Sequence, residues 1–296
     1  MKIFIAGGTG FVGSHLQREL LRRGHSLRLL IHRRSADIAP DVEQIEGDVT
    51  RQESLERAAE GCQAVINLVG IIREYPGRGI TFEKLHVQAT GNMLAMTRQC
   101  GIRRFLQMSA LGTRPAAVSD YHRTKFRAEE LVRHSGLEWT ILRPSLIFGP
   151  RDAFVNMLAA QLRLAPVMPV IGDGHYRLQP IHADDVARCF ALALELPQTI
   201  GHCFELCGNE RLTYLELLDS VAEATGTRPP VKPRLPVGLM KLMIPTLQRI
   251  PQFPITMDQL QMLLEGNTCD GAWKLTFGFE PRQFRQGIRE YLQHSS

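Results

Sequence analysis

The chain has 296 residues, of which 44% are hydrophobic and 22% are charged, with a formal net charge of +5 and a pI of about 9.0. This composition is typical of a globular protein with a buried core, and it excludes a disordered or low-complexity chain. The basic surplus is scattered along the sequence, so it indicates a solvated surface and argues against a nucleic-acid-binding protein.

No apolar run approaches the ~20 residues that a membrane-spanning helix needs. The first five residues predict a strand rather than a targeting segment. The 6 cysteines are scattered, and the spacing of Cys203 and Cys207 matches no zinc motif, so no metal site is expected. We expect free, buried cysteines and therefore a cytoplasmic protein.

Short apolar segments alternate with amphipathic ones through the first half of the chain. Strands are predicted over 2–6, 26–31, 42–46, 64–69, 104–108 and 139–143, and helices over 15–23, 53–60, 82–100 and 120–135. This alternation predicts an α/β fold, a Rossmann-type doubly wound parallel sheet with helices on both faces.

The second half is less regular. Helices are predicted over 154–164, 183–194 and 213–225, and a strand over 202–206. We therefore expect a dinucleotide-binding domain over 1–152 and a smaller, mainly helical C-terminal part over 153–296, with about 176–207 returning to the sheet. The apolar, Met-rich segment 239–247 is either a core helix, which is favoured because Met fills gaps in cores, or an exposed surface for a partner or a membrane.

A glycine-rich turn joins the first predicted strand to the first predicted helix. Its glycines have a GxxGxxG spacing, and its candidate cofactor-binding residues are Gly7, Thr9, Gly10, Phe11, Val12 and Gly13. Such a turn brings backbone amides and the positive end of a helix to a diphosphate, and Gly13 lets the helix pack closely on the strand. The position between a strand and a helix predicts a dinucleotide-binding loop.

The end of the second strand indicates which dinucleotide is bound. An acidic residue there would accept hydrogen bonds from the ribose hydroxyls of NAD, but the chain has His32, Arg33 and Arg34, and no acid before Asp37. Arginines can bind a 2′-phosphate through charge-assisted hydrogen bonds. NADP(H) is therefore the preferred cofactor and NAD(H) the alternative.

Two further strand ends carry candidate cofactor contacts. Asp48 and Val49 follow the third strand, where a carboxylate can accept a hydrogen bond from the adenine amino group. The fourth strand ends in Leu68, Val69 and Gly70, where the backbone would pass the ribose. Their order along the chain favours a cofactor role over ordinary turn chemistry.

Tyr121 and Lys125 are one helical turn apart and share a face. A nearby ammonium stabilises a phenolate, so we expect it to lower the pKa of Tyr121 from its usual value of about 10. That would suit a general acid or base, and Lys125 could also hold the nicotinamide ribose. Ser109 is a third candidate, either as a hydrogen-bonding partner of the substrate oxygen or as an ordinary turn serine.

With these residues in hand, the chain resembles an extended short-chain dehydrogenase/reductase over nearly its whole length. The resemblance includes the glycine turn, the Tyr121 and Lys125 pair, and the segments 142–150 and 180–187. It implies that Met108, Pro144, Ser145 and Ile147 also contact the cofactor, the last three beside the nicotinamide carboxamide.

Within that superfamily the chain is most similar to an atypical branch. The segments 105–112, 121–130 and 136–144 resemble the nucleotide-binding accessory subunit of respiratory complex I and its bacterial relatives. One departure from the active extended enzymes is the short stretch between Ser109 and Tyr121, which removes much of the loop that completes their substrate pocket.

Three functions follow from these observations. The first is an NADP(H)-dependent oxidoreductase that acts on a carbonyl or quinone-like small molecule, in which Tyr121 relays a proton. The second is a nucleotide-binding structural or assembly protein with respiratory or quinone-pathway partners. The sequence leaves peripheral contact with the inner face of a membrane open. The third, nucleotide-sugar epimerisation or dehydration, is disfavoured because its pocket needs the missing loop.

Overall fold

The computed structural model describes all residues except 34–37, 166, 249, 251–252, 254 and 294–296. The chain folds as two compact units. Unit 1 comprises Met1–Pro144, Asp184–Glu205 and Ala272–Gly278, and unit 2 comprises Ser145–Ala183, Leu206–Gly271 and Phe279–Ser296. Each unit is therefore built from segments that are distant in the sequence.

A seven-stranded sheet forms the centre of unit 1, in the order β11-β6-β5-β4-β1-β2-β3. Its strands are β1 (Lys2–Ala6), β2 (Ser26–Ile31), β3 (Glu43–Glu46), β4 (Ala64–Asn67), β5 (Arg104–Met108), β6 (Glu138–Pro144) and β11 (His202–Leu206). The pairs from β3 through β1 to β6 are parallel. The strand order reverses between β1 and β4, and ligands of doubly wound sheets bind at the carboxyl ends of the strands beside such a switch point.

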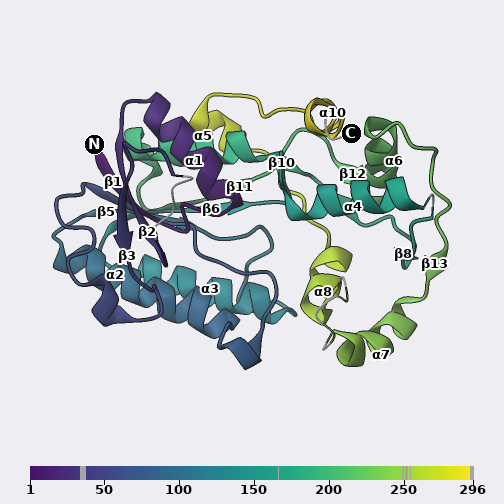
Figure 1. Cartoon of the computed structure of the whole chain (residues 1–296), viewed down its shortest axis with the longest axis horizontal. Helices are drawn as coiled ribbons and strands as arrows, with labels where there is room; N and C mark the ends of the chain where they lie inside the picture. Colours follow the sequence, from purple (N-terminus) through teal and green to yellow (C-terminus); the bar gives the residue numbers. More distant parts are fainter. Residues whose placement is uncertain (34–37, 166, 249, 251–252, 254, 294–296) are drawn as a thin grey trace. The chain divides into compact units, whose positions relative to one another are not determined.

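Helices cover both faces of this sheet (Figure 1), with α1 (Phe11–Arg22) and α5 (Ala183–Glu195) on one face and α2 (Ala89–Gln99) and α3 (Asp120–Arg133) on the other. The side chains beneath α2 and α3 form one buried cluster that includes Phe4, Phe105, Met93 and Val132. The predicted fold class, a doubly wound parallel sheet with a smaller helical C-terminal part, is confirmed.

Two predicted helices differ from the structure. The segment 53–60 is only a short 3₁₀ helix, Gln52–Leu55, followed by turns in which Arg57 has a left-handed φ of 57°. Its apolar side chains, including Leu55 and Ala58, are buried without a regular helix. The long helix predicted over 82–100 begins as a π-helix, Glu83–Gln88, before α2.

Unit 2 contains helices and short strand pairs. The helices are α4 (Ala153–Leu164), α6 (Tyr214–Ala224), α7 (Val237–Leu247), α8 (Met257–Glu265) and α10 (Phe284–Leu292), while α9 (Trp273–Phe277) belongs to unit 1. The strand pairs are β7 (Ile147–Phe148) with β10 (Ile181–His182), β9 (Arg177–Leu178) with β12 (Leu212–Thr213), and β8 (Val170–Ile171) with β13 (Arg234–Leu235). Buried side chains of α4, α6 and α10 share one core with Phe148.

A disulfide joins Cys207 to Cys269 within unit 2, across 62 residues of sequence. The expectation that all cysteines are free is therefore wrong for this pair, although Cys62 and Cys189 are free and buried as expected. Sequence spacing could not reveal the bond, because the tertiary fold brings the segment after α8 to the end of β11.

No helix within the described part of the chain combines the length and the apolar character needed to cross a membrane.

Candidate functional site

The glycine turn leaves the carboxyl end of β1 and leads directly into α1. Gly7 has a left-handed φ of 77°, and the amide of Gly10 donates to the carbonyl of Gly7 at 3.1 Å. Thr9 and Gly10 are exposed, Phe11 is half-buried, and Val12 packs into the core. The turn therefore presents an exposed rim of backbone at the start of a helix.

The start of α1 fits an anionic group. A Cβ on Gly13 would lie 2.2 Å from the carbonyl oxygen of Gly8 and 2.4 Å from that of Gly7, so the close approach requires glycine. The first turn of α1, described in full, carries no acidic side chain, and Gly10 offers no side chain to cap it. Its amides and helix dipole can therefore serve a diphosphate.

Two glycine-to-alanine variants test this loop. Gly13→Ala is expected to lower the free energy of unfolding by about 1–3 kcal/mol through overpacking and to weaken dinucleotide binding at least about tenfold. Gly10→Ala, whose Cβ would lie 3.3 Å from the carbonyl oxygen of Gly7, should cost less stability than Gly13→Ala, and we expect it to weaken binding because it adds a methyl group to the exposed part of the turn. Calorimetric titration with NADPH and thermal unfolding supply the two readouts.

Gly91→Ala is the matched control, because Gly91 lies on α2 and the nearest atom to its new Cβ, on Leu131 of α3, would be 3.9 Å away. We expect Gly91→Ala to lower neither the affinity for NADPH nor the thermal stability. Unchanged NADPH affinity in both Gly10→Ala and Gly13→Ala would show that this loop does not bind the diphosphate.

The residues expected to contact the adenosine half of the dinucleotide lie at the ends of β2 and β3. His32 and Arg33 are exposed, and Arg34 lies outside the described residues. Asp48 accepts hydrogen bonds from the amide and hydroxyl of Thr50, both at 2.8 Å. Burial raises the pKa of Asp48, but the hydrogen bonds from Thr50 outweigh it, so the net shift is downward and the group is a carboxylate.

Val49 and Leu68 are buried, whereas Val69 is half-buried and Gly70 is exposed at the end of β4. A Cβ on Gly70 would lie 2.7 Å from Nζ of Lys125. The structure therefore brings the chain after β4 close to the middle of α3. A single site that contains both Gly70 and Lys125 requires this proximity.

Lys125 is the most unusual group of this site. Its ammonium is buried, and Nζ is 3.4 Å from each of the carbonyl oxygens of Val69 and Met108, which end β4 and β5. Both contacts are long for hydrogen bonds. Burial lowers the pKa of Lys125 to about 8, although the charge of Glu129 opposes the shift. A weakly solvated cation of this kind favours polar ligand oxygens.

Tyr121 lies one turn earlier on α3, which begins after the capping residue Ser119. Its ring is buried edge-on against Phe82 and His86, with centroid separations of 5.8 and 5.4 Å. Burial raises the pKa of Tyr121 to about 12. The expectation that Lys125 lowers this pKa is therefore wrong in direction, because desolvation of the phenolate dominates.

His86 was missed by the sequence interpretation. It lies in the π-helix, with Nδ1 2.9 Å from Oγ1 of Thr124 and Nε2 3.2 Å from the carbonyl of Ile71. Burial, helped by the charge of Lys125, lowers its pKa to about 2, so the ring is neutral. His86 therefore links the chain after β4 to the helix that carries Tyr121 and Lys125. π-helices are frequent at functional sites, but periodicity alone does not identify them.

The remaining predicted residues are distributed over both units. The hydroxyl of Ser109 is buried and 3.4 Å from that of Thr113, and the carbonyl of Pro144 accepts from Leu111 at 2.9 Å; all of these belong to unit 1. Ser145 and Ile147 belong to unit 2. There the hydroxyl of Ser145 donates to the carbonyl of Gln179 at 2.6 Å, and Ile147 pairs with Ile181.

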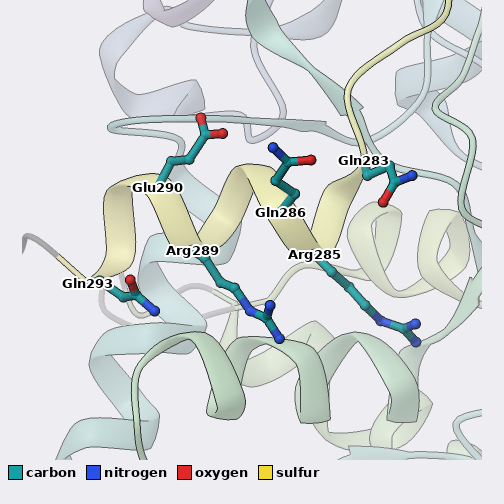
Figure 2. Close-up of a pocket in the computed structure, with 6 residues that line it drawn as sticks. All are labelled: Gln283, Arg285, Gln286, Arg289, Glu290 and Gln293. Carbon is teal, nitrogen blue, oxygen red and sulfur yellow. The ribbon is translucent and has the colours of Figure 1, made fainter.

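A hollow on unit 2 (Figure 2) is lined by polar residues of α10 and its preceding loop: Gln283, Arg285, Gln286, Arg289, Glu290 and Gln293. Arg289 donates to Glu223 at 2.6 Å and Arg285 donates to Ser220 at 3.2 Å, so both arginines hold α10 to α6. We place no functional site there. Among the described residues, no group of three or more His, Cys, Asp or Glu side chains is arranged to hold a metal ion.

Comparisons with known proteins agree with this geometry. The model of the NAD dependent epimerase/dehydratase family matches residues 3–207. The chain is similar to NADH dehydrogenase (ubiquinone) 1 alpha subcomplex subunit 9, mitochondrial, of Dictyostelium discoideum, with 29% identity over 75% of this chain and 63% of that protein. It therefore matches less than two thirds of that relative's length.

The chain is also similar to ceramide reductase of Caulobacter vibrioides, with 29% identity over 77% of this chain and 71% of that protein. Among solved structures, UDP-glucuronic acid 4-epimerase from Bacillus cereus, in complex with UDP-glucuronic acid and NAD, has a TM-score of 0.78. It is 18% identical and both chains are covered completely, so this likeness shows the fold alone.

Proposed function

The chain belongs to the NAD dependent epimerase/dehydratase family, and on that premise we propose that it is an NADP(H)-dependent oxidoreductase that reduces a carbonyl or quinone-like small molecule. The observation that carries the proposal is the buried pair of Tyr121 and Lys125, one turn apart on α3 beside the ends of β4 and β5. When bound, the dinucleotide supplies the hydride. The chain supplies the binding loop, the cation and the proton donor.

The residues present fit a dinucleotide. The amides at the start of α1 would hold the diphosphate, because no side chain of that turn competes for them. Asp48, a carboxylate at the end of β3, would accept from the adenine amino group. The ammonium of Lys125 would hold ribose hydroxyls, which would replace its two long contacts with backbone carbonyls.

The protonation states favour reduction over oxidation. With a pKa of about 12, Tyr121 carries its proton at neutral pH and can donate it to a carbonyl oxygen that accepts a hydride. With a pKa of about 8, Lys125 is mainly protonated at neutral pH and can stabilise the phenolate that remains. The carbonyl then gains one hydride and one proton and becomes an alcohol.

Arg33 supports the preference for NADP(H). It is exposed at the end of β2, where an acidic residue would favour NAD(H), and it lies beside the exposed His32. A guanidinium can form paired, charge-assisted hydrogen bonds with a 2′-phosphate. We therefore expect the wild-type protein to gain more thermal protection from NADPH than from NADH.

Arg33→Ala tests this preference. We expect it, alone or with Arg34→Ala, to weaken NADPH binding roughly tenfold to a hundredfold and to leave NADH binding nearly unchanged. The control is Arg103→Ala, because Arg103 is an exposed arginine that precedes β5 at the amino ends of the strands, whereas Arg33 follows the carboxyl end of β2. Titrations of all variants with both dinucleotides supply the comparison. Equal affinities of the wild-type protein for NADPH and NADH would contradict the 2′-phosphate assignment.

A second candidate function is a catalytically silent dinucleotide-binding protein that serves a respiratory or quinone-pathway assembly. Two observations favour it. Only a short stretch separates Ser109 from Tyr121, and the chain is similar to a subunit of mitochondrial NADH dehydrogenase. A silent protein would still be stabilised by NADPH but would transfer no hydride to any acceptor, so turnover distinguishes the two candidates.

A further inference from the structure

The helix α7 presents apolar side chains to solvent. Leu242 is 77% exposed, Leu239 is 45% exposed and Met243 is 42% exposed. Positions three and four apart lie on one face of a helix, so the three side chains form a continuous stripe, called here the α7 stripe. The exposed Ile250 follows shortly after the helix.

A second, adjacent face of α7 is buried within unit 2. Met240 and Ile244 form a small core with Leu260 of α8, against which Leu235 and Leu264 also pack. For the segment 239–247 the sequence left two alternatives, a core helix and an exposed apolar surface. In the structure one face of α7 is buried in a core and another is exposed. A helix that is apolar on two faces is normally covered on both, and an exposed row of apolar side chains is typical of an interaction surface.

The segment that carries the stripe is basic, and the nearest acidic residues on its C-terminal side, Asp258 and Glu265, belong to α8. Between Glu223 and Asp258 the sequence contains no acidic residue, and its basic residues there are Arg228, Lys232, Arg234, Lys241 and Arg249. Arg228, Arg234 and Lys241 are exposed, whereas Lys232 is paired with Asp219 at 2.5 Å. Arg249 lies outside the described residues.

An exposed apolar stripe on a basic segment favours one kind of partner. A second copy docked through the same face would bring like charges together, which opposes association. An anionic bilayer would accept leucine and methionine side chains at the boundary of its acyl chains and would attract the flanking cations. We propose that the α7 stripe attaches this protein peripherally to a membrane that contains anionic lipid, with α7 lying in the plane of the surface. This attachment is independent of the proposed reductase activity.

Vesicle co-sedimentation tests the proposal. The wild-type protein is expected to bind vesicles of phosphatidylcholine mixed with phosphatidylglycerol, to bind phosphatidylcholine vesicles more weakly, and to be released by salt. Replacing both Leu242 and Met243 with Gln should weaken binding at least about tenfold, because the inserted apolar area is lost. Lys241→Gln should weaken binding to the anionic vesicles about fivefold.

Leu275→Gln is the matched control. Leu275 is 91% exposed on α9 of unit 1, so the same change there should leave vesicle binding unaltered. Thermal protection by NADPH should be the same in every variant, which separates this test from that of the dinucleotide site. Equal vesicle binding by the wild-type protein and the Leu242→Gln, Met243→Gln variant would overturn the proposal. The proposal would also be overturned if the wild-type protein bound no vesicles and instead formed a concentration-dependent dimer that these substitutions dissociate.

Discussion

Tyr121→Phe is expected to lower kcat roughly a hundredfold to ten-thousandfold, the usual contribution of a positioned proton donor. Phe has nearly the same shape, and the ring of Tyr121 packs edge-on against Phe82 and His86, so the fold should be retained. The affinity for NADPH should change little, because the variant keeps Lys125. A loss of kcat at constant cofactor affinity would identify Tyr121 as the proton donor.

The measurement is NADPH oxidation in the presence of a panel of ketones, aldehydes and a short-chain quinone. Tyr214→Phe is the matched control, because Tyr214 is also 8% exposed but lies in the core of unit 2. Full activity of Tyr121→Phe would contradict the proton-donor role. If the wild-type protein reduces none of these acceptors, the catalytic proposal is wrong and the silent dinucleotide-binding protein is favoured.

Glu129→Gln is expected to lower the free energy of unfolding by about 3–5 kcal/mol, because it removes the buried counter-ion of the largely buried Arg143 guanidinium and leaves only the more exposed Glu205 at 3.5 Å. The carboxylate of Glu129 is completely buried and accepts from Nε and Nη2 of Arg143 at 2.8 and 2.6 Å. It also accepts from Arg133 at 2.6 Å. The pair joins α3 to β6, so its loss should loosen the helix that carries Tyr121 and Lys125.

Glu130→Gln is the control for this change. Glu130 is next on the same helix and also pairs with Arg133, but its side chain is 42% exposed, so its loss should cost less than about 1 kcal/mol. Chemical unfolding of both variants gives the comparison. Glu129→Gln should also lower the pKa of Lys125 below its value of about 8, because the charge of Glu129 raises that pKa; NMR of the lysine ammonium would measure it. Equal stabilities of the two variants would show that the buried ion pair does not stabilise the fold.

Local patterns in the sequence were sufficient to predict the framework of the site. The strand predicted over 104–108 is β5, residue for residue, and α3 and α1 begin within a few residues of their predicted starts. The glycine turn and the one-turn spacing of Tyr121 and Lys125 are also local patterns. They follow from backbone sterics and helix geometry, which neighbouring residues determine.

Other features depend on contacts between distant segments. The Cys207–Cys269 bond joins residues 62 positions apart, and His86 meets Thr124 and Ile71 only because β4, the π-helix and α3 converge. The pKa of Tyr121 is raised because its side chain is buried, and the spacing of residues along a helix does not show burial.

The sequence by itself therefore determined the fold class, the glycine turn between β1 and α1, and the one-turn spacing of Tyr121 and Lys125. Only the tertiary structure decided the protonation state of that pair, the partners of His86 and Cys207, and the face of α7 that meets solvent. The reason is physical: the backbone conformation follows from nearby residues, whereas desolvation, packing and exposure follow from the residues that the fold brings near.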